Sequence, residues 1–348
     1  MTDKNGQEQS EKMRYIFVVG NSRSGTTMMG RIIGNHPEVS SMHELHYFEQ
    51  LTPTNELEKK LSFEAAQTLL MRLFTIKNDG YSSQGNPERF KDEADNLLKS
   101  MTNKDWHYSI DVFKSFMLYE SQKVGRKYPC EDTPQNVFYI KEILHYLPEA
   151  RIVNMIRDPR DVLLSQKRRW KRRFLGHRNL PWREVFRYWF NYHPITIARL
   201  WNSAIRAADF HKDHPQVCQL RFEDLLEAPE EKVKELCDFT GLKYHEKMVN
   251  VPQIGSSTGV DYPEKKGIDP KVAGRWKKGG LTPVEIYLCQ RITRENMSLH
   301  GYPTSDIKPP LIPLILALIT FPLKLTVAFF MNLGRMRNVI ETLKRRFM

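Results

Sequence analysis

The sequence predicts an α/β fold: a P-loop-like parallel sheet flanked by helices, with a helical cap insertion and a hydrophobic C-terminal tail. Three observations predict it. Residues 15–27, YIFVVGNSRSGTT, are an apolar run that ends in a polar, glycine-containing loop. Residues 152–156 form a second buried-strand pattern, followed by a charged turn and a helical pattern. Residues 311–331 are almost continuously apolar.

Length and composition limit the alternatives. The 348 residues suffice for one large domain, and a net charge of +12 favours anionic partners such as nucleotides, acidic glycans or a membrane surface. No nucleic-acid recognition module accompanies the charge, so we expect no nucleic-acid partner. The four cysteines are widely spaced, which indicates a reducing, cytoplasmic setting and no metal site. Residues 1–14 lack the apolar core of a signal peptide and are expected to form a flexible tail.

The loop that ends the first strand has the chemistry of an anion site. Its backbone N–H groups and the positive end of the following helix suit a phosphate, whereas the alternative is an ordinary strand-to-helix turn. Thr26 stands where a kinase loop carries lysine, so Arg23 supplies the cation and a triphosphate with Mg²⁺ is disfavoured. The residues expected to hold the anion are Gly20, Asn21, Ser22, Arg23, Ser24, Gly25, Thr26 and Thr27.

The segment Arg-Ser-Gly-Thr-Thr after a hydrophobic strand resembles the 5′-phosphosulfate loop of sulfotransferases that use 3′-phosphoadenosine 5′-phosphosulfate (PAPS). The likeness is greatest to the branch that holds protein-tyrosine sulfotransferases and many bacterial sulfotransferases. It extends from about Tyr15 to Trp276. The resemblance implies a sulfotransferase domain over residues 15–308 that moves the sulfuryl group of PAPS to a hydroxyl without a metal ion.

The resemblance also implies a general base at Glu44, because the family carries a glutamate at this distance after the loop. The acceptor hydroxyl must lose its proton as it attacks, and a carboxylate within hydrogen-bond reach can take it. His43 and His46 are rivals, since the ordinary pKa of histidine suits neutral pH better. The alternative is that Glu44 is a surface or capping carboxylate.

Residues 51–127 have helical apolar spacing and are expected to form the cap insertion, a region that shapes acceptor specificity in the resembled family. The segment that follows departs from the family. Asp132 stands where a lysine usually stabilises the transferring sulfuryl group. Either Arg23 carries this charge alone, or Lys141 or a member of the basic run at 167–173 substitutes for the missing lysine.

A second phosphate site is implied by RIVNMIRDPRDVLLS, residues 151–165, in which Arg157 and Ser165 match the family's 3′-phosphate residues. A guanidinium gives bidentate bonds to phosphate. The alternative is a structural pair of Arg157 with Asp158 or Asp161. In the basic run, Arg169 matches a further phosphate-binding arginine, while 171–173 are expected to form a solvated helix face.

The remaining motifs extend the resemblance. Residues 182–210 predict an aromatic-rich helical stretch packed in the core, which Pro194 kinks or divides. Phe222 replaces a family tyrosine and so lacks its hydroxyl. Ser257 and Arg275 match the family's last cofactor segment.

The tail, residues 309–348, predicts membrane association. Its apolar run approaches the roughly 20 residues of a bilayer span, but Pro322 and Lys324 make a straight span less favourable than a monotopic or re-entrant anchor. Basic residues beyond it suit anionic lipid. The alternative is a pair of buried helices or an oligomer contact.

The sequence thus predicts a membrane-associated, PAPS-dependent sulfotransferase whose acceptor carries a hydroxyl, with a lipid, glycolipid or saccharide suiting the basic, anchored chain. Two rivals stay open. One is a P-loop small-molecule kinase, and the other is a non-catalytic, membrane-attached nucleotide-binding protein, which the replacements at Asp132 and Phe222 favour.

Overall fold

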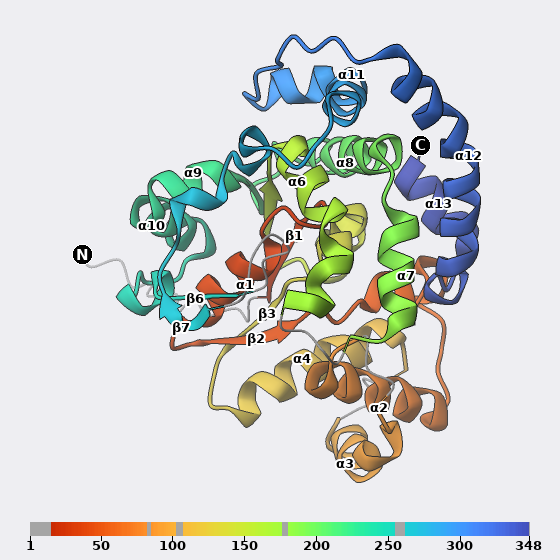
Figure 1. Ribbon diagram of the computed structural model, residues 1–348. Helices are drawn as coiled ribbons and strands as arrows, with labels where there is room; N and C mark the ends of the chain where they lie inside the picture. Colours follow the sequence, from red (N-terminus) through yellow and green to blue (C-terminus); the bar gives the residue numbers. More distant parts are fainter. Residues whose placement is uncertain (1–14, 82–84, 102–106, 176–179, 255–261, 348) are drawn as a thin grey trace.

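A five-stranded parallel sheet organises the chain (Figure 1). The computed structural model describes residues 15–81, 85–101, 107–175, 180–254 and 262–347. The strand order is β2-β3-β1-β4-β5, so the strand before the phosphate loop lies at the centre. The strands are β1 (Tyr15–Gly20), β2 (Val39–His43), β3 (Tyr128–Glu131), β4 (Ala150–Ile156) and β5 (Val217–Arg221), and an antiparallel pair joins β6 (Pro252–Gln253) to β7 (Tyr262–Lys266).

Helices surround this sheet and confirm the predicted α/β class. The helices are α1 (Thr26–Gly34), α2 (Phe63–Asp79), α3 (Lys91–Ser100), α4 (Ser109–Lys123), α5 (Ile140–Tyr146), α6 (Pro159–Lys167), α7 (Trp182–Asn191), α8 (Pro194–Asp209), α9 (Phe222–Glu227), α10 (Pro229–Thr240), α11 (Pro283–Leu299), α12 (Leu311–Asn332) and α13 (Val339–Phe347).

The central strand is buried on both faces because its side chains alternate between two cores. Tyr15, Phe17 and Val19 pack with α2 and α4, whereas Ile16 and Val18 pack with α1, α9 and α10. Residues 51–127 therefore share a core with the sheet. The C-terminal end of α2 and the turn after it also line the main cavity, and a role of this region in acceptor selection stays a prediction.

Local sequence signals place several helix ends. The chain breaks between α7 and α8 at Pro194, as predicted. Gly241 ends α10 in the left-handed conformation, with φ of 71°. The helical pattern after residues 152–156 forms α6, which begins at Pro159 because the Asp158 carboxylate accepts a hydrogen bond from the Arg160 backbone N–H and caps it.

The expectation that α7 packs wholly in the core is wrong. Val185 is buried, but Phe186 and Trp189 are 55% and 47% exposed. These residues recur at the spacing of an amphipathic helix, and the helix is present. However, α7 turns an aromatic side outward and buries Arg187 and Tyr188 instead. Helical periodicity identifies the faces of a helix and not which face meets the protein.

The C-terminal segment forms α12 and α13, which lie beside α7 in Figure 1. Residues 311–335 are long and apolar enough to cross a membrane, yet only 6% of the most apolar window is buried in the protein. Of the two alternatives to membrane association, a pair of buried helices therefore does not fit the described structure.

We expect Gly20→Ala to destabilise the protein strongly. Gly20 has φ of 147°, and an added Cβ would lie 2.5 Å from the backbone oxygen of Met155 on β4. Gly125 also has positive φ, at 68°, but faces open space. Urea unfolding should therefore show a loss of about 1 kcal/mol for Gly125→Ala and about 3 kcal/mol for Gly20→Ala. Equal losses would contradict the close approach of β1 and β4.

Candidate active site

The candidate site lies where all five parallel strands end. Residues just beyond each strand line one cavity of about 1430 Å³. They are Arg23 after β1, Glu44 after β2, Asp132 after β3, Arg157 after β4 and Phe222 after β5. Ligands of open α/β sheets bind at this edge, so the topology brings the predicted site residues together. The cavity exceeds the roughly 300–1,000 Å³ of ordinary small-molecule pockets, which leaves room for two substrates.

The phosphate loop is tightly shaped. Gly25 has φ of 97°, and a Cβ there would meet the Phe222 ring at 2.4 Å, so the loop lies directly on that ring. Arg23 also adopts a left-handed conformation, with φ of 76°, which non-glycine residues rarely do. The loop residues that line the cavity are Ser22, Arg23, Gly25, Thr26 and Thr27, while Gly20, Asn21 and Ser24 lie outside its lining.

Arg157 is held in place by uncharged groups. Its guanidinium donates to the carbonyl oxygens of Arg23 at 3.2 Å and Val272 at 3.1 Å, and it stacks over Phe222 at 4.4 Å. Its own carbonyl accepts a bond from the Trp201 indole at 2.9 Å. No ion pair with a carboxylate is present among the described residues.

The carboxylates proposed as structural partners of Arg157 are engaged elsewhere. Asp158 pairs with Arg160 at 2.7 Å. The Asp161 carboxylate accepts the backbone N–H groups of Gly274 and Trp276, at 2.7 and 2.9 Å. It thereby fixes the loop that places Arg275 in the cavity lining. Ser257, the other residue predicted in this segment, lies outside the described residues.

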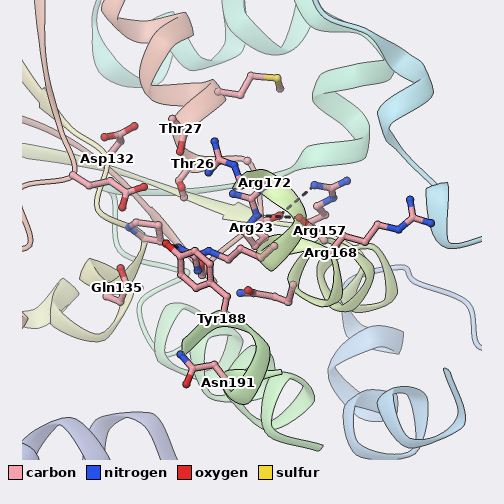
Figure 2. Close-up of a pocket in the computed structure, with 18 of the residues that line it drawn as sticks. Arg23, Thr26, Thr27, Asp132, Gln135, Arg157, Arg168, Arg172, Tyr188 and Asn191 are labelled. Atoms are coloured by element: carbon pink, nitrogen blue, oxygen red, sulfur yellow. Dashed lines mark hydrogen bonds between the residues drawn. The ribbon is translucent and has the colours of Figure 1, made fainter. Parts of the chain in front are cut away.

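The two predicted phosphate sites meet. Arg23 Nε donates to Ser165 Oγ at 2.9 Å, so the loop after β1 is bonded to the helix after β4 (Figure 2). Arg157 joins the same contact, because its guanidinium donates a hydrogen bond to the Arg23 carbonyl oxygen. The two motifs are 142 positions apart in the chain, and the sheet places their polar groups side by side.

Further arginines make this junction strongly cationic. Arg169 and Arg172 line the cavity with Arg23 and Arg157, and Figure 2 shows Arg172 close to Arg23 and Arg157. Burial and the charges of these neighbours lower the pKa of Arg23 to about 9. The basic run was expected to be solvated at 171–173, which is wrong for Arg172. The run forms a 3₁₀ segment, Arg169–Leu175, and not the helix face on which that expectation depended.

An anion fits this arrangement. Arg157 Nε and Arg169 Nε, both on side chains that line the cavity, are buried and have no hydrogen-bond partner among the described residues. Buried donors without partners cost free energy, and a cluster of like charges costs more. A bound phosphate or sulfate would satisfy the donors and neutralise the charge.

Glu44 lines the same cavity as this cluster and is bonded to His46, with 3.3 Å between Oε2 and the imidazole Nε2. His46 Nδ1 accepts from Gln50, so the other ring nitrogen is the donor to Glu44. Burial raises the pKa of Glu44, but the bond to His46 and the charges of Arg169 and Arg23 outweigh it. The pKa therefore lies below its ordinary value of 4.5, and Glu44 is ionised at neutral pH.

The backbone around Glu44 is held from β3. The Leu45 N–H donates to the Glu131 carboxylate at 3.0 Å, and the His46 N–H donates to Thr133 Oγ1 at 3.0 Å. His43 and His46 both have positive φ, 58° and 54°, so Glu44 sits between two strained residues. Such a conformation persists only because its surroundings hold it, which indicates a positioned carboxylate and not an incidental surface one.

Asp132 is buried and lines the same cavity. Burial, with Glu44 and Glu131 nearby, raises its pKa well above the ordinary value, so the uncharged carboxyl is favoured. The cavity therefore has an acidic side chain, favoured in its uncharged form, where the resembled family has a lysine. Lys141 is exposed and outside the cavity lining, so it does not substitute for that lysine, whereas Arg169 and Arg172 are close enough to Arg23 to do so.

Comparison with known proteins agrees with this geometry. The model of the sulfotransferase family matches residues 15–246, two thirds of the chain. The chain belongs to the sulfotransferase family. The resemblance drawn from the loop and strand motifs is thereby confirmed.

Relatives of this sulfotransferase are distant. A putative protein-tyrosine sulfotransferase of Caenorhabditis briggsae is 23% identical over 85% of this chain and 91% of its own. An uncharacterized protein of Aquifex aeolicus is 24% identical over 78% of this chain, which spans only about a third (32%) of that protein. The sulfotransferase domain of the Synechococcus PCC 7002 olefin synthase covers 84% of this chain and 96% of its own, with 21% identity and a TM-score of 0.51, and supports the fold.

We expect millimolar inorganic sulfate to raise the melting temperature of the sulfotransferase by several degrees, because an anion relieves the repulsion between buried arginines. Binding at a hundredfold excess over Kd contributes about 2.7 kcal/mol. The rise should be largely lost in Arg157→Ala and kept in Arg183→Ala, which removes an exposed arginine. Differential scanning fluorimetry against chloride at equal ionic strength measures it. An equal rise in both variants would show a nonspecific salt effect.

Proposed function

We propose that this sulfotransferase moves the sulfuryl group of PAPS to a hydroxyl of its acceptor. The observation that carries the proposal is the junction of Arg23, Ser165 and Arg157, where the two sequence motifs for the two ends of a doubly phosphorylated nucleotide meet. A nucleotide with anionic groups at the 5′ and 3′ positions needs two such cradles on one sheet edge.

Different residues of the chain would bind the two anionic ends of PAPS. The loop Gly20–Thr27 would hold the 5′-phosphosulfate through its backbone N–H groups, and Arg23 would neutralise charge on the leaving phosphate. The 3′-phosphate would lie against a second group of residues, Arg157, Ser165 and Arg169. Arg275 and Ser257, which match the family's last cofactor segment, are the further residues predicted to bind the nucleotide.

Glu44 is the proposed general base. As the acceptor oxygen bonds to sulfur, the bond from sulfur to the bridging phosphate oxygen breaks and its electron pair leaves with adenosine 3′,5′-bisphosphate. The acceptor's proton goes to the Glu44 carboxylate, which His46 orients. The lowered pKa of Glu44 favours its ionised form at neutral pH, so the carboxylate can accept the proton of the acceptor hydroxyl. The raised pKa of Asp132 favours an uncharged carboxyl in the same cavity.

Two alternatives are less well supported. A kinase needs a cation on the β- and γ-phosphates, but Thr26 stands at the position of the loop lysine. A non-catalytic nucleotide-binding protein would not need a strained and doubly anchored carboxylate beside the anion cluster. We further propose that the chain works at the cytoplasmic surface of a membrane, to which α12 and the basic residues after it attach it.

Transfer of label tests the proposal directly. We expect ³⁵S from PAPS, and not ³²P from γ-labelled ATP, to reach an acceptor. Glu44→Gln should lower kcat by at least about a hundredfold, because general base catalysis contributes roughly 10²–10⁴-fold. Binding of adenosine 3′,5′-bisphosphate should change little in that variant. Glu230→Gln, at an exposed position, is the matched control. Label from ATP alone would establish the kinase instead.

The pH dependence separates Glu44 from its imidazole rivals. Since the pKa of Glu44 lies below 4.5, the acid limb of kcat/KM should fall below pH 4.5, with a flat profile up to neutral pH. A histidine base would place that limb near the ordinary histidine pKa of about 6.5. Circular dichroism over the same range shows whether the fold persists. A limb near 6.5 in a folded enzyme would rule out Glu44 as the base.

A further inference from the structure

The outward side of α12 is mainly apolar, with the exposed hydroxyl residues Thr320 and Thr326 among its side chains. Its large apolar side chains are between 37% and 73% exposed. A contiguous apolar surface of this kind on a soluble monomer marks an interaction site. The residues are Leu311, Ile312, Ile315, Leu316, Leu318, Ile319, Leu323, Leu325 and Phe330.

The aromatic side of α7 continues this surface. Trp182, Phe186 and Trp189 are exposed at the spacing i, i+4 and i+7, so they form one stripe. The stripe joins α12 at Lys324, whose ammonium lies 4.6 Å from the Trp189 ring centre, between exposed Leu323 and Leu325. We call the exposed apolar side chains of α7 and α12 the apolar face.

Helix α12 is bound to the rest of the protein along its length. Near its first turns, the Ala317 carbonyl lies 3.1 Å from the His193 imidazole. At its end, Asn332 exchanges hydrogen bonds with Asn191 and accepts one from Arg187. These contacts are 15 residues apart, about 22 Å along a helix. Side-on attachment at both positions suits a helix that lies along a membrane surface.

Cations border the apolar face. The Arg173 guanidinium stacks on Trp182 at 4.6 Å, as Lys324 does on Trp189. Arg183, Arg337 and Lys344 are exposed nearby in the chain. Tryptophan and basic side chains around an apolar surface are the composition of proteins that sit at the headgroup level of anionic bilayers. This charge complementarity identifies the occupant as a bilayer and not a second copy of this equally basic chain.

The inner side of the same helix is a wall of the active-site cavity. Ala328 and Phe329 line it from α12, together with Leu325, which is 37% exposed and so belongs to both surfaces. Tyr188 and Tyr192 line it at α7 and just beyond. α12 lies beside α7 (Figure 1). The cavity is therefore lined both by the arginine cluster and by the helix whose other side is the apolar face. Its wall changes along the way from cationic to apolar and aromatic.

We propose that the acceptor is a membrane lipid with a hydroxyl-bearing head group, which reaches Glu44 from the bilayer between α7 and α12. The inference depends on the proposed sulfuryl transfer and names its substrate class. The head group occupies the polar part of the cavity, while the acyl chains stay against the apolar wall and in the bilayer. A water-soluble acceptor would leave that wall in contact with water.

Vesicle flotation tests the apolar face. With vesicles of phosphatidylcholine and phosphatidylglycerol, we expect Leu323→Asp with Phe330→Asp to weaken binding by at least about tenfold. Neither residue lines the cavity. The matched control is Leu299→Asp with Phe210→Asp, an exposed leucine at the C-terminal end of α11 and an exposed phenylalanine that directly follows α8. If vesicle binding were lost equally in both double variants, or in neither, the proposal that the apolar face binds the membrane would be overturned.

Photo-crosslinking tests whether lipid enters the cavity. Phe329 and Phe330 are neighbours, but Phe329 lines the cavity and Phe330 points outward. With p-benzoylphenylalanine at either position, we expect phosphatidylglycerol adducts by mass spectrometry from both. Adducts at Phe330 alone would overturn the lipid acceptor even if the protein docks.

A separate measurement keeps this inference apart from the proposed function. If adenosine 3′,5′-bisphosphate binds but Phe329 gives no lipid adduct, the lipid acceptor is wrong and sulfuryl transfer stands. If the nucleotide does not bind, the proposed function is wrong, whatever the vesicles show.

Discussion

The structure of the site depends on how Arg157, a buried guanidinium at the centre of an arginine cluster, is held in place. Arg157 is fixed by two backbone carbonyls and a phenylalanine ring, and the Trp201 indole holds its backbone. The Arg23 guanidinium donates to the Ser165 hydroxyl beside it. Because the partners of Arg157 carry no charge, its position is set while its charge is not neutralised by them. Carboxylate partners would have stabilised the empty protein at the expense of anion binding.

That arrangement explains why the nearby carboxylates are placed as they are. Asp158 and Asp161 follow Arg157 directly in the chain, yet one neutralises Arg160 and the other orders the loop of Arg275. In the same cavity the pKa of Glu44 is lowered and that of Asp132 is raised, so the ionised form is favoured at one carboxyl and the uncharged form at the other. The opposite shifts follow from the surroundings, since His46 and the arginines outweigh burial at Glu44, whereas burial and then the charges of Glu44 and Glu131 raise the pKa of Asp132.

The C-terminal segment belongs to the same structural unit. Arg346 of α13 pairs with buried Glu49, five residues beyond Glu44, and Arg345 pairs with Glu142 and Glu341. Removing residues 311–348 would therefore take away a cavity wall and a support of the Glu44 segment along with the apolar face. Point substitutions on the outer side of α12 separate these effects, and a deletion does not.

The sequence predicted the fold and much of the site because the informative signals were local. A strand, a glycine loop and a helix start are visible in adjacent residues, and the structure has β1, the loop and α1 in that order. What could not be predicted depends on packing between distant segments. The outward turn of Phe186 and Trp189 follows from how α7 meets α12. The inclusion of Arg172 in the cavity follows from a 3₁₀ segment where a helix was expected. The direct bond from Arg23 to Ser165 was implied by neither motif alone.

The central claim is that two anion cradles meet at one sheet edge, and isothermal titration with three nucleotides tests it most directly. The account predicts that adenosine 3′,5′-bisphosphate binds at least about tenfold more tightly than either adenosine 5′-phosphate or adenosine 3′-phosphate, since each charge-assisted contact contributes roughly 1.5–3 kcal/mol. In Arg157→Ala, the advantage over adenosine 5′-phosphate should largely disappear. Equal affinity for all three nucleotides in the native chain, or an unchanged advantage in the variant, would contradict the account.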